Sequence, residues 1–384
     1  MKISLCMIVK NEEKYIQQCL ESALEIVDEA VIVDTGSTDN TIDIINKNFK
    51  KNVKVINYQW ENDFSAARNV SLSHATGDWI LILDADEKIS CDKAKLLEKL
   101  DRPDNVAYII PIYNFQSSGN IDYSTCMIRL YKNEGCRYEG AIHEQIMFTD
   151  GLQTKEVLDK AICKIFHYGY LKSSFDRQGK IERNINIIKS EIAKNPKSAF
   201  HWYNLGIMKM IEHKYDDAIN HFIKSNKLCN GIRTTFSTDL VLRMAMCMFA
   251  LKQYKMCEEF LDHALGDNEL RKLPDLFYYN GLAKKAQKKY VDAISCFDQC
   301  IKIGEVSEGI SIRGMGSYLP MLEMARIKEL QKKITEAVML YMEAVLHKNN
   351  YLKDGKEEFI HLLRRNNMNV VLDEFKKVLS TAVS

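Results

Sequence analysis

Four short apolar segments near the start of the chain constrain its fold more than any other feature. Their sequences are ISLCMIV (3–9), AVIVD (30–34), VKVIN (53–57) and WILILD (79–84). Most of these runs are nearly continuously apolar, which is typical of strands buried on both faces. The stretches between them repeat apolar residues at helical spacing, and a helix over 66–74 is expected to be capped by Ser65. Strands that alternate with helices build a doubly wound, mostly parallel, Rossmann-like sheet, so the chain is predicted to begin with an α/β domain.

The part of the chain from about residue 105 to about residue 170 has a different pattern. It contains segments rich in β-branched and aromatic residues, such as VAYIIPIYNF and CMIRLYKNEG. Residues of these types favour strands. We expect this part to form a smaller, mixed sheet that completes the first domain.

The rest of the chain is nearly free of proline and carries an internal repeat. The segments YDDAINHF, YKMCEEFL, YVDAISCF and ITEAVMLY place a small residue at 218, 257, 293 and 337, and a W-x2-L-G element precedes the first of them. These elements are typical of tetratricopeptide repeats, which are stacked helix pairs of about 34 residues. We therefore predict an α/β domain over 1–172, an all-α domain of tetratricopeptide-like repeats over 173–345, and capping helices over 346–384.

The composition excludes several classes of function. Lys and Arg number 53 against 52 Asp and Glu, so the net charge of +1 creates no field that would recruit nucleic acid. No apolar run approaches the roughly 20 residues of a membrane-spanning helix, and the start of the chain lacks the pattern of a signal peptide, so a cytoplasmic location is expected. The eleven cysteines include no C-x-x-C pair, and we expect them to be free thiols.

Acidic residues end two of the predicted strands. Asp34 closes the second strand, and Asp84-Ala85-Asp86 follows the fourth. Parallel sheets bind ligands beyond the carboxyl ends of their strands. A D-x-D motif there can hold Mg²⁺ or Mn²⁺ against a diphosphate, with Asp86 on the metal and Asp84 on ribose or metal-bound water. The alternatives are an ordinary loop start for the D-x-D motif and a turn-forming role for Asp34.

Four stretches of the chain together resemble the family 2 glycosyltransferases of the GT-A fold. They are SLCMIVKNEEKYIQQCLES, VIVDTGSTDNT, FSAARNVSLSHATGDWILILDADE and YEGAIHEQI, and the resemblance covers roughly the first 170 residues. The family's usual Asp-Asp-Gly-Ser reads Asp-Thr-Gly-Ser here, so only the first acid, Asp34, is retained. With its helical-repeat tail, the chain is similar to the peptide cysteine S-glycosyltransferases that make glycosylated bacteriocins. It is similar as well to lipopolysaccharide-type sugar transferases.

The resemblance implies a set of site residues. Those implied to bind the nucleotide-sugar are Val9, Asn11, Glu12, Asp34, Arg68, Asn69, Asp84 and Ala85. Those implied to hold Mg²⁺ or Mn²⁺ are Asp84, Asp86, His143 and His167. An inverting transfer also needs a base, for which Glu144 and Glu87 are both candidates. The simplest interpretation of Arg129 is that it forms a salt bridge.

The resemblance therefore implies a metal-dependent, inverting transfer of a hexose or N-acetylhexosamine from a UDP-sugar to a peptide or protein side chain. Cysteine sulfur is one candidate acceptor, since a thiolate is a strong nucleophile. Transfer to a cell-surface saccharide or a lipid-linked acceptor is an alternative, and a non-catalytic helical-repeat adaptor is another. The helical repeats are expected either to bind a peptide or to pair in a homodimer.

Overall fold

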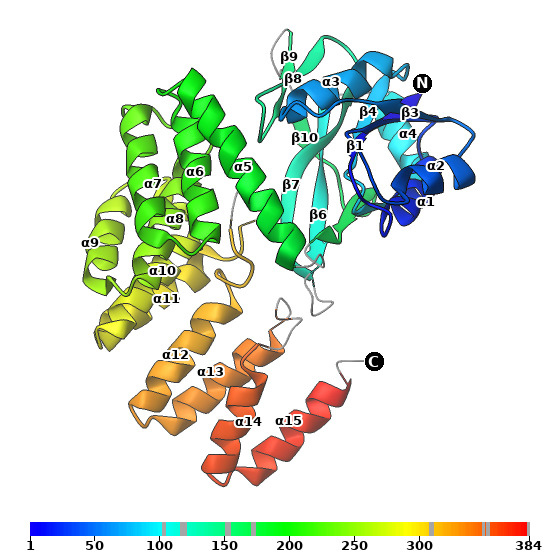
Figure 1. Ribbon diagram of the computed structural model, residues 1–384. Coiled ribbons are helices and arrows are strands. Elements are labelled where there is room, and N and C mark those ends of the chain that lie inside the picture. Colours follow the sequence, from blue (N-terminus) through cyan, green and yellow to red (C-terminus); the bar gives the residue numbers. More distant parts are fainter. Residues whose placement is uncertain are drawn as a thin grey trace. The chain divides into compact units, whose positions relative to one another are not determined.

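The computed structural model divides the chain into two compact units, Met1–Pro196 and Lys197–Ser384, which are described separately. The structure describes residues 1–101, 105–115, 121–149, 155–169, 174–306, 311–347, 350 and 354–381. The expected boundary between 172 and 173 lies outside the described residues. Helix α5 (Ser174–Lys194), which the sequence analysis assigned to the repeats, belongs to the first unit (Figure 1).

A nine-stranded sheet forms the centre of the first unit. Its strand order is β3-β2-β1-β4-β7-β6-β11-β5, with β10 paired to β6. The strands are β1 (Ile3–Val9), β2 (Glu29–Asp34), β3 (Val53–Asn57), β4 (Trp79–Ile82), β5 (Glu87–Cys91), β6 (Ala107–Phe115), β7 (Ile121–Lys132), β10 (Lys155–Val157) and β11 (Cys163–His167). The four strands predicted from the apolar runs are parallel neighbours, as expected.

The β-rich segment after residue 105 joins this same sheet, so the expectation of a separate smaller sheet was wrong. Strand β7 pairs antiparallel with both β4 and β6, and this pairing links the parallel and mixed halves. Strand β11 is parallel to β6 and antiparallel to β5, a strand that the sequence analysis did not predict. Within the described residues, β8 (Cys136–Glu139) and β9 (Gln145–Phe148) form the one additional small sheet.

Helices cover both faces of the parallel half. They are α1 (Ile16–Leu24), α2 (Thr41–Asn48), α3 (Phe64–His74) and α4 (Lys93–Asp101). Side chains of a strand point alternately to its two faces. Accordingly, Leu5 of β1 joins the core cluster that contains α1 and α4, whereas Cys6 joins the cluster on the α3 side. Helix α3 is capped by Asp63 and not by the expected Ser65, because the Asp63 carboxylate accepts a hydrogen bond from the backbone N–H of Ala66.

Two cysteines of the first unit form a disulfide. The antiparallel register of β5 and β11 places Cys91 opposite Cys163, and their Cα atoms lie 4.3 Å apart. The expectation that all cysteines are free thiols was therefore wrong for this pair. The two residues are 72 positions apart in the chain, so no local spacing in the sequence could indicate their contact.

The second unit consists of helix pairs that match the predicted repeats. Its helices are α6 (Ala199–Ile211), α7 (Tyr215–Cys229), α8 (Ser237–Ala250), α9 (Tyr254–Ala264), η2 (Leu270–Lys272), α10 (Pro274–Ala286), α11 (Tyr290–Ile303), α12 (Tyr318–Leu330), α13 (Ile334–Leu346), α14 (Lys356–Arg365) and α15 (Asn369–Thr381). The small residues at the four repeat positions, Ala218, Cys257, Ala293 and Ala337, are fully buried. No helix among the described residues is long and apolar enough to cross a membrane.

Candidate functional site

A cavity of about 780 Å³ lies at the carboxyl ends of β1 and β4, a volume within the usual range for small-molecule sites. The residues expected in the site that line this cavity are Val9, Glu12, Arg68, Asp84, Ala85, Asp86, His143, Glu144 and His167. The expected residues that do not line it are Asn11, Asp34, Asn69 and Glu87. The sheet thus brings most of the expected site residues to one edge. Each expected residue outside the lining is hydrogen-bonded or ion-paired to another part of the first unit, as described below.

The ends of β1 and β2 are shaped by side-chain hydrogen bonds to the turn that follows β2. Asp34 accepts hydrogen bonds from the Ser37 hydroxyl at 2.6 Å and from its backbone N–H at 3.0 Å. Asn11, whose φ is 55°, accepts a hydrogen bond from the Thr38 backbone N–H at 2.7 Å. Both side chains therefore hold the turn in place, and Thr35 is the turn residue that reaches the cavity.

Two neighbouring residues of α3, Arg68 and Asn69, contact different parts of the first unit. The Arg68 guanidinium donates from Nη2 to Asp84 Oδ1 at 3.1 Å and from Nε to Glu144 Oε1 at 2.5 Å. Burial acts to lower the pKa of Arg68, but the two carboxylates raise it above its ordinary value. Asn69 instead exchanges two hydrogen bonds with the backbone of Tyr138, at 2.9 and 2.7 Å. Arg68 is therefore fixed at the cavity wall, and Asn69 fixes strand β8.

A second arginine lies beneath the cavity and binds two of the acids that follow β4. Arg129 Nη2 is 2.7 Å from Glu87 Oε1 and 3.4 Å from Asp84 Oδ2. Burial acts to raise the pKa of Asp84, but Arg129 and Arg68 hold it well below its ordinary value. Burial raises the pKa of Glu87 to about 7 in spite of Arg129. With 2% of its side chain exposed and no part in the cavity lining, Glu87 is a buried partner of Arg129, and its role as a base stays a prediction.

Asp86 and His167 form a separate pair at the cavity. His167 Nε2 lies 3.6 Å from Asp86 Oδ1, while its Nδ1 lies 2.8 Å from Asn114 Oδ1. Burial acts to lower the pKa of His167, but the hydrogen bond and charge of Asp86 raise it above its ordinary value. A Cβ atom added at Gly169 would lie 2.4 Å from His167 Nε2 and 2.7 Å from Asp86 Oδ2. The space in front of this pair is thus kept open by a residue without a side chain.

The expected metal ligands are not all brought together. Among the described residues, no three His, Cys, Asp or Glu side chains gather into a group that could hold a metal ion. Asp84 is bound by two arginines, whereas Asp86 and His167 present one carboxylate and one imidazole to the open space beside Gly169. Magnesium sites of nucleotide enzymes commonly use one or two protein ligands and take the others from phosphate and water. Asp86 and His167 fit such a site, and the metal itself stays a prediction.

The loop before β9 places His143 and Glu144 at the cavity. His143 has a φ of 54°, a left-handed conformation that is uncommon for residues other than glycine. Two residues earlier, the carbonyl of Ala141 accepts a hydrogen bond from the backbone N–H of Phe64 at 2.9 Å, which ties the loop to the start of α3. The positions of His143 and Glu144 therefore depend on the same helix that carries Arg68.

Helix α5 adds three cavity residues that the sequence analysis missed. Lys180, Arg183 and Asn184 line the cavity, and they occupy positions i, i+3 and i+4, which share one face of a helix. The Arg183 guanidinium lies over the Phe64 ring at 5.0 Å, and burial lowers the pKa of Arg183. The spacing of Lys180 and Arg183 along one helical face is visible in the sequence. These residues were not expected at the site because α5 was predicted to belong to the repeats.

Comparisons with known proteins find a glycosyl transferase family, two glycosyltransferases and a repeat-containing protein that are similar to this chain. Residues 4–174 match glycosyl transferase family 2. An uncharacterized glycosyltransferase of Haemophilus influenzae is 31% identical over 258 residues, which are 59% of this chain and 98% of that protein. Glycosyltransferase SunS of Bacillus subtilis is 29% identical over 227 residues, 58% of this chain and 53% of SunS. A TPR repeat-containing protein of Synechococcus elongatus is 34% identical over 212 residues, 53% of this chain and 51% of that protein. This chain thus spans about half the length of the last two relatives.

Two solved structures align with this chain at TM-scores below 0.5. Residues 1–349 of S. aureus TarS in complex with UDP align with a TM-score of 0.34 at 18% identity, covering 80% of this chain and 95% of that chain. MamA aligns with a TM-score of 0.37 at 18% identity, covering 48% of this chain and 94% of that chain.

Proposed function

This chain belongs to glycosyl transferase family 2, and we propose that it transfers a hexose or an N-acetylhexosamine from a UDP-sugar to a peptide or protein side chain. One observation carries the donor half of the proposal. Arg68 Nη1 is buried at the cavity wall and has no hydrogen-bond partner among the described residues. A buried guanidinium N–H that lacks a partner is costly, and a phosphate oxygen would satisfy it.

The other charges of the cavity support the same donor. Lys10, Arg68, Lys180 and Arg183 all line it. The diphosphate of a nucleotide sugar is anionic, and its charge increases as the bond to the sugar breaks. Preorganised cations at that position stabilise the departing group, which is usually the largest single contribution to such catalysis. Because two carboxylates hold Arg68, its planar fork is oriented before the donor binds.

Asp86 and His167 are the residues that would hold Mg²⁺ or Mn²⁺. When bound there, the ion would supply further neutralisation of the diphosphate. The contact from Asn114 to His167 Nδ1 leaves Nε2 as the ring nitrogen directed at Asp86. A ligating histidine is commonly oriented in this way through its other nitrogen. Gly169 supports the assignment, since any side chain there would occupy the space beside both ligands.

Glu144 is the base that we propose for an inverting transfer. Its side chain is 14% exposed and lines the cavity, whereas that of Glu87 is 2% exposed and lies beneath it. In this reaction the acceptor loses a proton to the base while the bond from the sugar's anomeric carbon to the diphosphate oxygen breaks with its electron pair. The hydrogen bond from Arg68 Nε occupies one oxygen of the Glu144 carboxylate. A cysteine thiol, with a pKa near ~8.5, needs less assistance than an alcohol and is therefore the acceptor group we favour.

The proposal is tested by measuring UDP release from a panel of UDP-hexoses and UDP-N-acetylhexosamines. The protein is assayed with Mn²⁺ or with EDTA, and with two peptides that differ only in a cysteine or a serine. We expect metal-dependent release that the cysteine peptide accelerates. Glu144→Gln should reduce kcat by about 100-fold or more, whereas Glu134→Gln, which removes an exposed acid outside the cavity, should leave it unchanged. Absence of UDP release with every donor, together with absence of UDP binding, would overturn the proposal.

A further inference from the structure

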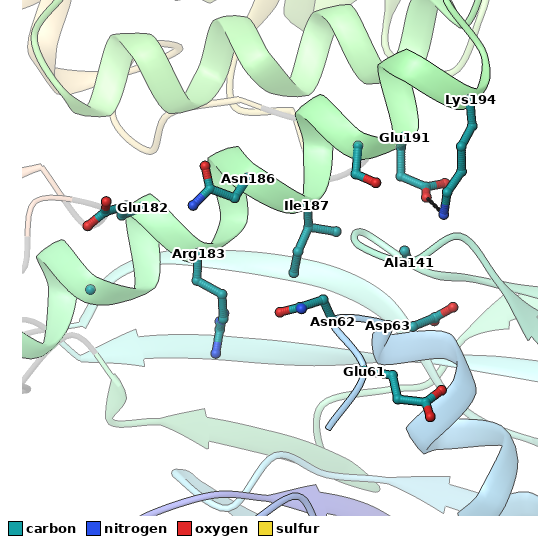
Figure 2. A pocket seen from close by; sticks show the side chains of 12 residues that line it. Glu61, Asn62, Asp63, Ala141, Glu182, Arg183, Asn186, Ile187, Glu191 and Lys194 are labelled. Atoms are coloured by element: carbon teal, nitrogen blue, oxygen red, sulfur yellow. Dashed lines mark hydrogen bonds and ion pairs between the residues drawn. The ribbon is translucent and has the colours of Figure 1, made fainter. Parts of the chain in front are cut away.

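A second cavity of about 560 Å³ lies between α5 and the segment that precedes α3. Figure 2 shows Asn186, Ile187, Glu191 and Lys194 projecting from the helix, with Asn62 on the opposite segment. The cavity, called the α5 cavity below, has a volume in the usual range for ligand sites. None of the residues proposed for the donor site lines it apart from Arg183.

The α5 cavity adjoins the donor cavity. Asn62 and Arg183 line both of them. Arg183 extends from the helix (Figure 2), and its guanidinium is held by the Phe64 ring at 5.0 Å and by Asn184 Oδ1 at 3.0 Å. A molecule in the α5 cavity would therefore be separated from the donor by one arginine side chain. A polypeptide segment bound there needs only to extend past Arg183 to bring its acceptor side chain to Glu144 and the donor.

The charges of the α5 cavity differ from those of the donor cavity. Four carboxylates line it, against the cations Arg183 and Lys194, and they belong to Glu61, Asp63, Glu182 and Glu191. Two of these acids are engaged, since Glu191 pairs with Lys194 at 2.7 Å and Asp63 caps α3. Glu61 and Glu182 are exposed and form no ion pair with any residue that the structure describes. The α5 cavity therefore presents uncompensated negative charge.

The remaining lining suits a polypeptide better than a sugar. Asn62, Asn186 and Ser190 offer hydrogen-bond donors and acceptors of the kind that pair with peptide groups. None of the described residues that line the α5 cavity is aromatic, so it contains no flat ring on which the apolar face of a sugar could stack.

We propose that the α5 cavity is the acceptor site, and that it binds a polypeptide segment with a lysine or arginine close to the residue that receives the sugar. The inference rests on the proposed glycosyl transfer and adds the place and charge of the acceptor. The carboxylates of Glu61 and Glu182 select the cationic segment. Arg183 marks the boundary with the donor.

The test measures peptide binding to the full chain saturated with UDP and Mn²⁺. The probes are two fluorescein-labelled heptapeptides with a central serine, which is flanked by lysines in one and by glutamates in the other. Fluorescence anisotropy should show the lysine peptide binding at least about tenfold more tightly. In Glu61→Gln/Glu182→Gln this preference should fall below about threefold, while Glu25→Gln/Asp43→Asn, which removes two exposed acids elsewhere in the first unit, should retain it.

A steric variant tests the place independently of charge. Ser190→Trp fills the α5 cavity and should weaken the lysine peptide at least about tenfold, whereas Lys189→Trp, at an exposed neighbouring position that lines neither cavity, should change binding less than about twofold. Equal binding of the two peptides, or undiminished binding by Ser190→Trp, would overturn the inference. Displacement of the lysine peptide by chitotriose would instead indicate a saccharide acceptor and overturn it as well. UDP titration of the same proteins reads the donor cavity alone, so failure to bind UDP would contradict the proposed function and not merely this site.

Discussion

Replacement of Arg129 by methionine tests whether Glu87 is a structural ion. The substitution leaves the Glu87 carboxylate, 2% exposed, without its counter-ion at 2.7 Å. Removing one partner of a buried ion pair costs about 3–5 kcal/mol of stability. Burial already raises the pKa of Glu87 to about 7, and the loss of Arg129 raises it further. A carboxyl group whose pKa is raised on folding lowers the stability of the fold as the pH rises from its unfolded pKa to its folded pKa. Because the folded pKa is higher in the variant than in the wild-type protein, the defect grows above pH 7 and is largest at alkaline pH.

The expected defect is therefore about 3–5 kcal/mol near pH 8.5, and it shrinks by up to about 1.4 kcal/mol for each unit that the pH is lowered toward 7. Below about pH 7 the defect levels off, because Glu87 is then protonated in the wild-type protein as well. Urea unfolding is followed by tryptophan fluorescence in a Trp202→Phe background, which leaves Trp60 and Trp79 of the first unit as reporters. The control Arg129→Met/Glu87→Gln removes both charges and should recover much of the stability without the pH dependence. An equal defect at pH 8.5 and at pH 7 would refute the assignment of Glu87 as a buried charge.

Three further substitutions test other parts of the structure. Arg68→Lys replaces a fork that binds two carboxylates by a single ammonium, and calorimetry should show UDP affinity reduced by about tenfold or more. Gly169→Ala places a Cβ 2.4 Å from His167 Nε2, so Mn²⁺ affinity should fall by about 10- to 100-fold while circular dichroism stays unchanged; unaltered Mn²⁺ binding would argue against this ligand. Gly206→Ala places a Cβ 2.5 Å from the Phe222 ring and should destabilise the second unit by about 1–3 kcal/mol in thermal unfolding, and an unchanged midpoint would contradict the tight helix packing.

The parts of the fold that could be predicted from sequence are those with a local pattern. The apolar runs gave the parallel strands, because a strand buried on both faces must be continuously apolar. The repeats were visible because each helix pair needs a small residue at its closest approach, and positions 218, 257, 293 and 337 are indeed fully buried. The acids after β4 were placed at the binding edge for the same reason, since β4 ends at Ile82 and only Leu83 separates it from Asp84.

The parts that could not be predicted depend on contacts between distant segments. The pairing of β5 with β11 sets Cys91 against Cys163 and brings His167 near Asp86, and no short-range pattern encodes that register. The same limit applies to Glu87, whose motif position suggested catalysis until Arg129 of β7 was found beneath it. Local hydrogen bonds at Asp34 and Asn11 also compete with the ligand contacts that the family resemblance implied.

Mn²⁺-dependent binding of UDP, measured by isothermal titration calorimetry, tests the central claim most directly. The account predicts that the wild-type chain binds UDP, and that Mn²⁺ strengthens binding by about tenfold or more. Asp86→Asn should lose the effect of Mn²⁺ while retaining the weaker metal-free binding through Arg68 and the other cations of the cavity. If wild-type protein binds no UDP with or without Mn²⁺, or if Asp86→Asn responds to Mn²⁺ as wild type does, the assignment of this cavity as a metal-assisted donor site is contradicted.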